Sequence, residues 1–190
     1  HIETIAEFSG KHAGSTEAHL PDRVRVVKEY RHLVFEKTAR PHQSERHLQA
    51  NPFPLFRYTL KGYGTYHIHE IKKELTIRPH FTPLSQTEMK TGKNIAFFDE
   101  RKLDFPLLIR NVEPGDRFRP INSHGTQKLK KYFIDHKIPK SIRYVTPIIE
   151  CHDRIIWVVG HRIDESVKVD ETTRQIVRME VSLAFGDEND

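Results

Sequence analysis

The chain has 190 residues, of which 30% are charged and 36% hydrophobic, with a formal net charge of +5 and a single cysteine. A chain of this length buries about 70% of the surface that it exposes when unfolded, and this composition excludes an intrinsically disordered polymer. One thiol excludes an internal disulfide, and the sequence has no membrane-length apolar run and no signal-peptide pattern, so we expect a cytoplasmic protein.

Residues 1–19 are predicted to be a helical remnant followed by a linker. The first apolar residues recur at helical spacing, and the polar stretch 11–17 is typical of a linker. Because the chain opens on His1 and not on Met, we expect a fragment whose natural N-terminal neighbour is missing.

The region that follows is predicted to be rich in β-strands. Alternating or continuous apolar stretches with β-branched and aromatic residues indicate the strands. They fall at residues 23–27, 33–35, 56–60, 65–69, 74–78 and 94–99. The first two would form a hairpin, and the His-rich segment 39–50, which has no periodicity, is expected to be a loop.

Two histidines in this region could chelate a metal. His67 and His69 would point to the same face of a strand. No third ligand occurs at a recognisable spacing, so we expect no metal here, and a strand face that meets solvent or RNA is the preferred interpretation.

The stretch from residue 107 to residue 143 is the most informative part of the chain. An apolar strand would end at Val112, and Pro114, Gly115 and Asp116 have turn chemistry: proline fixes φ, glycine accepts a positive φ, and aspartate bonds the backbone. Pro120 excludes a helix through itself, so the chain after the turn should be extended. For Asp116 a turn or capping role is preferred over a general base, because no titratable partner lies at a telling spacing.

A basic helix is predicted at residues 126–138. Ser123 or Thr126 would cap it, and Leu129 and Phe133 would share its apolar face. The Ile138-Pro139 pair should end this helix and start another, because proline is tolerated in the first turn of a helix.

The excess positive charge of the chain is confined to residues 110–143. This segment contains nine Lys/Arg and three Asp/Glu, a balance of +6, so the remaining residues sum to −1. A long row of cations beside loops is typical of a surface that binds a phosphate backbone. The alternative is a solvated helix face.

The C-terminal part predicts further strands. Residues 147–150 and 155–159 flank a turn at 151–154, with Trp157 in the core and Cys151 a passive thiol. Residues 175–184 alternate, with Val177, Met179, Val181 and Leu183 on one face. The predicted fold class is α+β, with mainly antiparallel, sandwich-like sheets and a few short helices, in two subdomains, 20–100 and 101–190.

The central stretch resembles a known family. The residues that carry the resemblance are Pro114, Gly115, Asp116, Arg117, Pro120, Gly125, Lys128, Leu129, Lys130, Phe133, Ile138, Pro139, Arg143 and Pro147, with the block 157–164 after them. They are similar to the C-terminal domain of bacterial tRNA(Ile)-lysidine synthase. Asn122 departs from the glycine that is common there, although asparagine also tolerates left-handed backbone.

The resemblance implies a function. The family's enzyme uses ATP to activate the wobble cytidine of the isoleucine tRNA with a CAU anticodon and then joins lysine to it, which forms lysidine. ATP and Mg are expected in the family's N-terminal domain, whose Ser-Gly-Gly-x-Asp-Ser signature has no counterpart here beyond Ser9-Gly10-Lys11-His12. We therefore expect a non-catalytic, tRNA-binding part with no cofactor of its own, which holds the acceptor-stem end of the tRNA.

Eight cations are the candidate RNA contacts. They are Arg110, Arg117, Arg119, Lys128, Lys130, Lys131, Lys140 and Arg143, and Pro114, Gly115, Asp116 and Gly125 are expected to shape the loops. Two alternatives remain open: an enzyme whose loops at 114–125 cradle a phosphorylated small molecule, and a dimerisation or scaffolding domain that forms a homodimer. The first lacks a phosphate-loop signature and any nucleophile or acid–base constellation.

Overall fold

A computed structural model describes residues 16–21, 24–29, 32–37, 53–81 and 93–184. The chain forms two compact units, one made of His1–Phe53 with Phe133–Arg143 and the other of Pro54–Tyr132 with Tyr144–Asp190. No helix among the described residues is long and apolar enough to cross a membrane.

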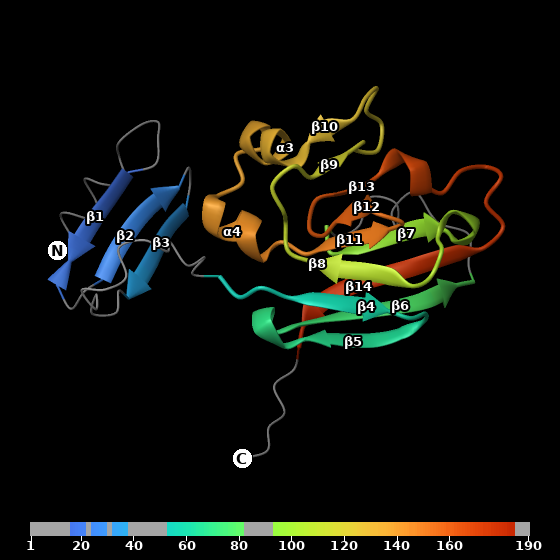
Figure 1. The fold of residues 1–190 in the computed structure, drawn as a ribbon, viewed down its shortest axis with the longest axis horizontal. Helices are drawn as coiled ribbons and strands as arrows, with labels where there is room; N and C mark the ends of the chain where they lie inside the picture. Colours follow the sequence, from blue (N-terminus) through green and yellow to red (C-terminus); the bar gives the residue numbers. More distant parts are fainter. Residues whose placement is uncertain (1–15, 22–23, 30–31, 38–52, 82–92, 185–190) are drawn as a thin grey trace, which may run out of the picture. The chain divides into compact units, whose positions relative to one another are not determined.

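The first unit contains a three-stranded antiparallel sheet. Its strands are β1 (Thr16–Leu20), β2 (Val24–Glu29) and β3 (His32–Lys37), with β2 in the centre (Figure 1). The predicted β2–β3 hairpin is confirmed, with Glu29 paired to His32. The predicted linker overlaps β1, where Thr16 pairs with Lys28, and the predicted helical remnant before it lies outside the described residues.

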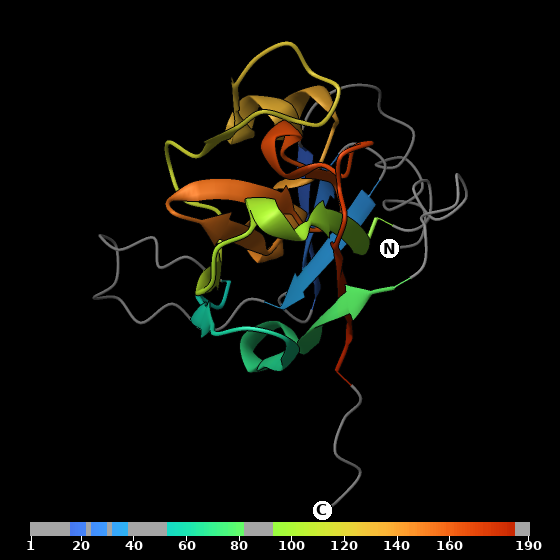
Figure 2. The same ribbon diagram turned by 90° about the vertical axis from the view of Figure 1, so that its right-hand side faces the viewer.

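The second unit contains two large antiparallel sheets (Figure 1 and Figure 2). The five-stranded sheet has the order β13 (Arg162–Ile163), β12 (Arg154–Val158), β11 (Ile148–Cys151), β8 (Leu107–Arg110) and β4 (Arg57–Leu60). The four-stranded sheet has the order β5 (Gly64–Ile68), β6 (Lys73–His80), β14 (Ile176–Leu183) and β7 (Ile95–Asp99). The predicted class, α+β with mainly antiparallel sheets, is confirmed.

One hydrophobic core joins the two sheets. Ile109 and Trp157 from the five-stranded sheet and Phe98 and Met179 from the four-stranded sheet are all buried in it. The rings of Phe98 and Trp157 meet edge to face, with centroids 6.0 Å apart. The core position predicted for Trp157 is confirmed.

Alternation on β14 follows the prediction except at its end. Val177, Met179 and Val181 are buried, whereas Leu183 is 73% exposed. β7 pairs with β14 only as far as Glu180, and the N–H of Val181 donates to the carbonyl of Asn94, so Ser182 and Leu183 pair with β6 alone.

The predicted subdomain boundary near residue 101 falls inside the second unit. β4, from the predicted first subdomain, pairs with β8 of the second, and β14 lies between β6 and β7. These pairings join strands that lie far apart in the sequence, and they hold the unit together. The composition of a short stretch of sequence does not reveal them.

Short helices and one small ribbon complete the fold. They are η2 (His69–Ile71), η3 (Glu100–Lys102), β9 (Arg117–Phe118), β10 (Gln127–Lys128), α3 (Leu129–Asp135), α4 (Lys140–Val145) and η4 (Glu165–Val167). The helix predicted at 126–138 is therefore shorter, because its first residues pair with β9.

The end of α3 has a clear physical cause. Lys137 adopts a left-handed φ of 54°, its N–H donates to the carbonyl of Ile134, and the N–H of Ile138 donates to the carbonyl of Phe133. This pair of bonds is a Schellman motif, which satisfies the last carbonyls of a helix. As predicted, Pro139 follows and a second helix, α4, begins at Lys140.

Candidate nucleic-acid interface

Two cations lie directly opposite each other in the β9–β10 ribbon. Arg117 pairs with Lys128, and Phe118 with Gln127. Directly opposite residues share one face of a ribbon, with Cβ atoms about 4.5–5.5 Å apart, and like charges there destabilise the pairing. Both side chains are exposed. An anion bound between them would remove the repulsion, which makes this pair the centre of the candidate site.

Helix α3 continues the row of cations. Lys130 and Lys131 are exposed, while Leu129, Tyr132 and Phe133 are buried. The predicted apolar face is thus confirmed, and because the apolar residues turn inward, the lysines are left on the solvent side. We call five exposed cations of β9, β10, α3 and the loop between β9 and β10 the basic surface. They are Arg117, Arg119, Lys128, Lys130 and Lys131.

The turn before β9 has the predicted chemistry. Gly115 has a φ of 98°, a conformation that a side chain would strain. The N–H of Glu113 donates to Oδ2 of Asp116 at 2.8 Å, so the turn role preferred for Asp116 is confirmed. Pro114 is exposed within this turn.

The backbone of the loop between β9 and β10 is fixed by hydrogen bonds to the backbone and side chains of residues 163–165. The N–H of Arg119 donates to Oδ2 of Asp164 at 2.7 Å, and the carbonyl of Arg119 accepts from the N–H of Glu165 at 2.8 Å. The N–H of Asn122 donates to Oε2 of Glu165, also at 2.8 Å. Asn122 has a φ of 63°, which confirms that asparagine takes the left-handed position. Arg119 therefore has a fixed backbone and an exposed side chain.

Two loop expectations need correction. The hydroxyl of Ser123 donates to the carbonyl of Gly125 and does not cap α3. The first amide of α3, that of Leu129, donates instead to the carbonyl of Asp116 at 2.8 Å. Gly125 has no left-handed φ, and a Cβ built on it meets nothing within 4 Å, so the loop does not require glycine at this position.

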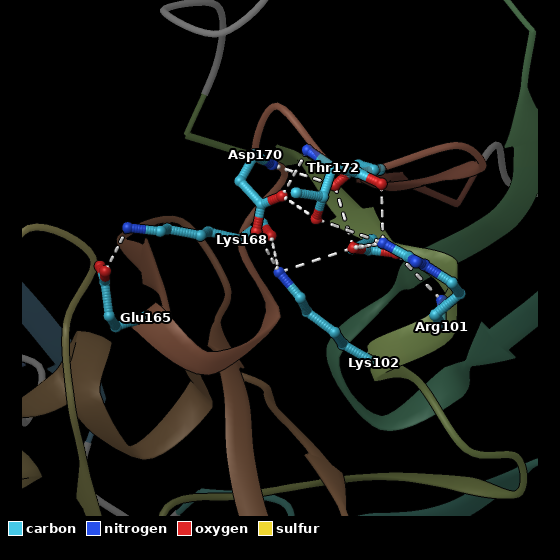
Figure 3. Close-up of polar contacts among 8 residues, drawn as sticks. Arg101, Lys102, Glu165, Lys168, Asp170 and Thr172 are labelled. Carbon is cyan, nitrogen blue, oxygen red and sulfur yellow. Dashed lines mark hydrogen bonds and ion pairs between the residues drawn. The ribbon is translucent and has the colours of Figure 1, made fainter.

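Glu165, which accepts a hydrogen bond from this loop, and Asp170 are each paired with a lysine (Figure 3). A hydrogen bond from Lys168 lowers the pKa of Glu165, and the N–H of Asn122 adds to the effect. Lys102 donates to Asp170 at 2.7 Å and to the carbonyl of Lys168 at 2.9 Å, and it holds the pKa of Asp170 well below its ordinary value. Lys102 and Lys168 are therefore both paired with acids of the protein.

Arg110 does not belong to the basic surface. Its side chain is only 6% exposed, and it pairs with Asp116 at 2.9 Å and with Glu150. A guanidinium enclosed by protein carboxylates cannot reach an RNA phosphate. This arrangement corrects the expectation that Arg110 contacts RNA, and the sequence concealed it because Glu150 lies forty residues away.

The two remaining candidates lie in the first unit. Lys140 is exposed at the start of α4. Arg143 is half-buried, and its Nε donates to the carbonyl of Ile138 at 2.7 Å, so part of its donor capacity is used within the protein.

The structure also adds a cation that the sequence analysis missed. Arg162 on β13 is exposed and lies beside Tyr132 of α3. Burial raises the pKa of Tyr132, and the nearby guanidinium offsets part of the rise. The ring of Tyr132 also meets those of Phe118, at 5.1 Å, and His161, at 6.0 Å. The sequence analysis counted charges only over residues 110–143, and it therefore did not include Arg162.

Metal binding and thiol chemistry are the other possibilities for the described part of the chain. No cluster of three or more His, Cys, Asp or Glu suited to a metal occurs among the described residues. His67 and His69 stack with ring centroids 6.1 Å apart, and Nδ1 of His67 lies 3.4 Å from Glu74. Cys151 is buried.

Comparisons with known proteins point to one family. Residues 107–181 match the family model described as the TilS substrate C-terminal domain. The tRNA(Ile)-lysidine synthase of Caldanaerobacter subterraneus subsp. tengcongensis is 32% identical to the chain, over 95% of the chain and 36% of the relative. That of Dehalococcoides mccartyi is 31% identical over 96% of the chain and 37% of the relative.

A solved structure supports the fold. The crystal structure of a TILS C-terminal domain has a TM-score of 0.59 and 23% identity, and it covers 70% of this chain and 100% of that one. The resemblance predicted from the sequence is thereby confirmed, and the chain spans little more than a third of the length of the two relatives.

Proposed function

We propose a function from one premise: this chain resembles the C-terminal region of tRNA(Ile)-lysidine synthase. The chain acts as the tRNA-binding part of such an enzyme, and its basic surface holds the acceptor-stem end of the isoleucine tRNA. The observation that carries this proposal is the opposed pair Arg117 and Lys128, two exposed cations whose repulsion a bound phosphate would relieve.

The chemistry of the basic surface suits double-stranded RNA. An A-form stem is recognised mainly by its shape and by contacts to phosphates and 2′-hydroxyls. Lysine supplies point charges for phosphates, whereas arginine can bond two phosphate oxygens at once. Arg117 and Arg119 are therefore the better candidates for contacts that fix the orientation of the stem.

The rest of the reaction belongs to the part of the enzyme that precedes this region. ATP, Mg and lysine would be used there to convert the wobble cytidine of the CAU anticodon to lysidine in the cytoplasm. In this division of labour the C-terminal part contributes affinity and the choice of tRNA, because the methionine tRNA with the same anticodon must be rejected at a site away from the anticodon.

Binding of tRNA to the 190-residue chain as a function of salt tests the proposal. If four or five phosphates are contacted, the affinity should fall roughly a hundredfold between 50 and 200 mM salt. A minihelix that carries only the acceptor stem should retain most of the binding, and an anticodon hairpin should not. A flat salt response, or equal binding of the two fragments, would contradict the proposal.

A further inference from the structure

The buried Arg110 is surrounded by groups that fix its position. Its guanidinium donates to Oδ1 of Asp116 at 2.9 Å, to Oδ2 of the same residue at 3.0 Å, to Glu150 and to the carbonyl of Asn111 at 2.7 Å. Burial disfavours the charged form, but the two carboxylates outweigh it and raise the pKa of Arg110. The side chains of Asp116 and Glu150 are also nearly buried, at 10% and 8% exposed.

Asp116 transmits this fixed position to the basic surface. Its carbonyl accepts the N–H of Leu129 at 2.8 Å. Asp116 precedes Arg117, and Leu129 follows Lys128, so this bond lies next to the opposed cation pair in the ladder. The contacts of Arg110 therefore determine where the ribbon begins relative to β8 and β11.

Asn111, next to Arg110, fixes the backbone at Pro54, Phe56 and Tyr144 through its side-chain amide. Its Oδ1 accepts the N–H of Phe56 at 2.6 Å, and its Nδ2 donates to the carbonyls of Pro54 at 3.1 Å and Tyr144 at 2.8 Å. The chain leaves the second unit after Tyr132 and re-enters it at Tyr144. Two adjacent residues at the end of β8 thus hold the start of α3 and the end of α4.

We propose that Arg110 is a positioning residue that sets the register and presentation of Arg117 and Lys128 through its contacts with Asp116 and Glu150. This inference rests on the proposed function. A buried ion group is often no more stabilising than apolar residues of similar volume. Its contribution here is geometric: a rigid guanidinium fork defines the position of the turn, which an apolar contact would leave free to slide.

An apolar replacement of the whole group separates geometry from stability. In the variant R110M/D116L/E150L we expect the unfolding midpoint to stay within about 5 °C of that of the unmodified chain. We expect tRNA binding to weaken at least tenfold and the slope of log affinity against log salt to fall by about 2, because two phosphate contacts are lost. The matched control replaces the Arg178–Glu180 pair by R178M/E180L and should keep both the affinity and the slope.

A conservative variant covers the case in which the triple replacement does not fold. R110K keeps the charge but cannot bridge both carboxylates, so hydrogen exchange at the Leu129 amide should accelerate at least tenfold while amides of β11 and β12 stay protected. Wild-type affinity and slope in the triple variant, or unchanged Leu129 exchange in R110K, would overturn the inference. If the unmodified chain binds no tRNA, the proposed function fails, and Leu129 exchange in R110K still decides whether Arg110 positions the ribbon.

Discussion

Arg117 and Lys128 are cross-strand partners in a ribbon of only two residue pairs, with both side chains exposed. Directly opposite like charges cost on the order of 0.2–1 kcal/mol relative to a neutral pair. The ribbon therefore keeps an arrangement that is unfavourable in the absence of an anion.

Neutralising one member of this pair should have opposite effects on stability and on binding. In R117Q or K128Q we expect the free energy of unfolding to rise by about 0.2–1 kcal/mol because the repulsion is removed. Affinity for tRNA should fall by roughly three- to tenfold at 100 mM salt as one phosphate contact is lost. Urea unfolding and filter binding on the same preparations measure the two quantities. A variant that is both less stable and weaker in binding would indicate a structural role.

Charge reversal of the three lysines at β10 and α3 should abolish binding without unfolding the protein. K128E/K130E/K131E should bind tRNA at least a hundredfold more weakly, with little change in the unfolding midpoint because all three side chains are exposed. The control K61E/K93E/R174E changes the net charge by the same amount at exposed positions outside the basic surface. Equal losses in both variants would mean that only net charge matters.

The segment around η4 should become unstable in acid. The pKa of Asp170 is lowered by Lys102, and that of Glu165 by Lys168. A lowered carboxyl pKa stabilises the fold above the ordinary value of about 4, and this contribution is lost as the pH falls through the folded-state pKa. The unfolding midpoint should therefore decrease below about pH 4, and less steeply in D170N than in the unmodified chain. Parallel curves for the two proteins would exclude this origin.

Truncating the aromatic pair in the core should be costly, whereas truncating the end of β14 should not. F98A removes a fully buried ring that meets Trp157 and should cost about 3–5 kcal/mol. L183A should cost less than about 0.5 kcal/mol because its side chain is exposed. Urea titration at 25 °C compares the two. Similar costs would show that the end of β14 is covered in solution.

The chain by itself should not turn over ATP. With lysine, Mg and tRNA present, we expect no release of pyrophosphate or AMP above background, because the proposed chemistry requires the preceding part of the enzyme. Release of pyrophosphate or AMP that persists after the chain has been purified over two columns would refute this division of labour.

The sequence correctly predicts those features of the fold that depend on residues close together in the chain. Strand alternation, the turn at Gly115 and the stop at Pro139 are all determined within a few positions, and the structure confirms them except at Leu183, the exposed end of β14. It failed where a distant partner decides the outcome. Arg110 counts as one more cation until Glu150 is placed beside it, and residues 127–128 appear helical until β9 pairs with them.

The position of β14 has a consequence for how the protein forms. Among the described strands, β7 pairs only with β14, which comes last of them in the sequence but lies inside its sheet. While the ribosome is still translating the preceding region, β7 has no neighbour to accept its hydrogen bonds. Completion of the sandwich must therefore wait until residue 183 has been synthesised, and the nascent chain exposes an unsatisfied sheet edge until then.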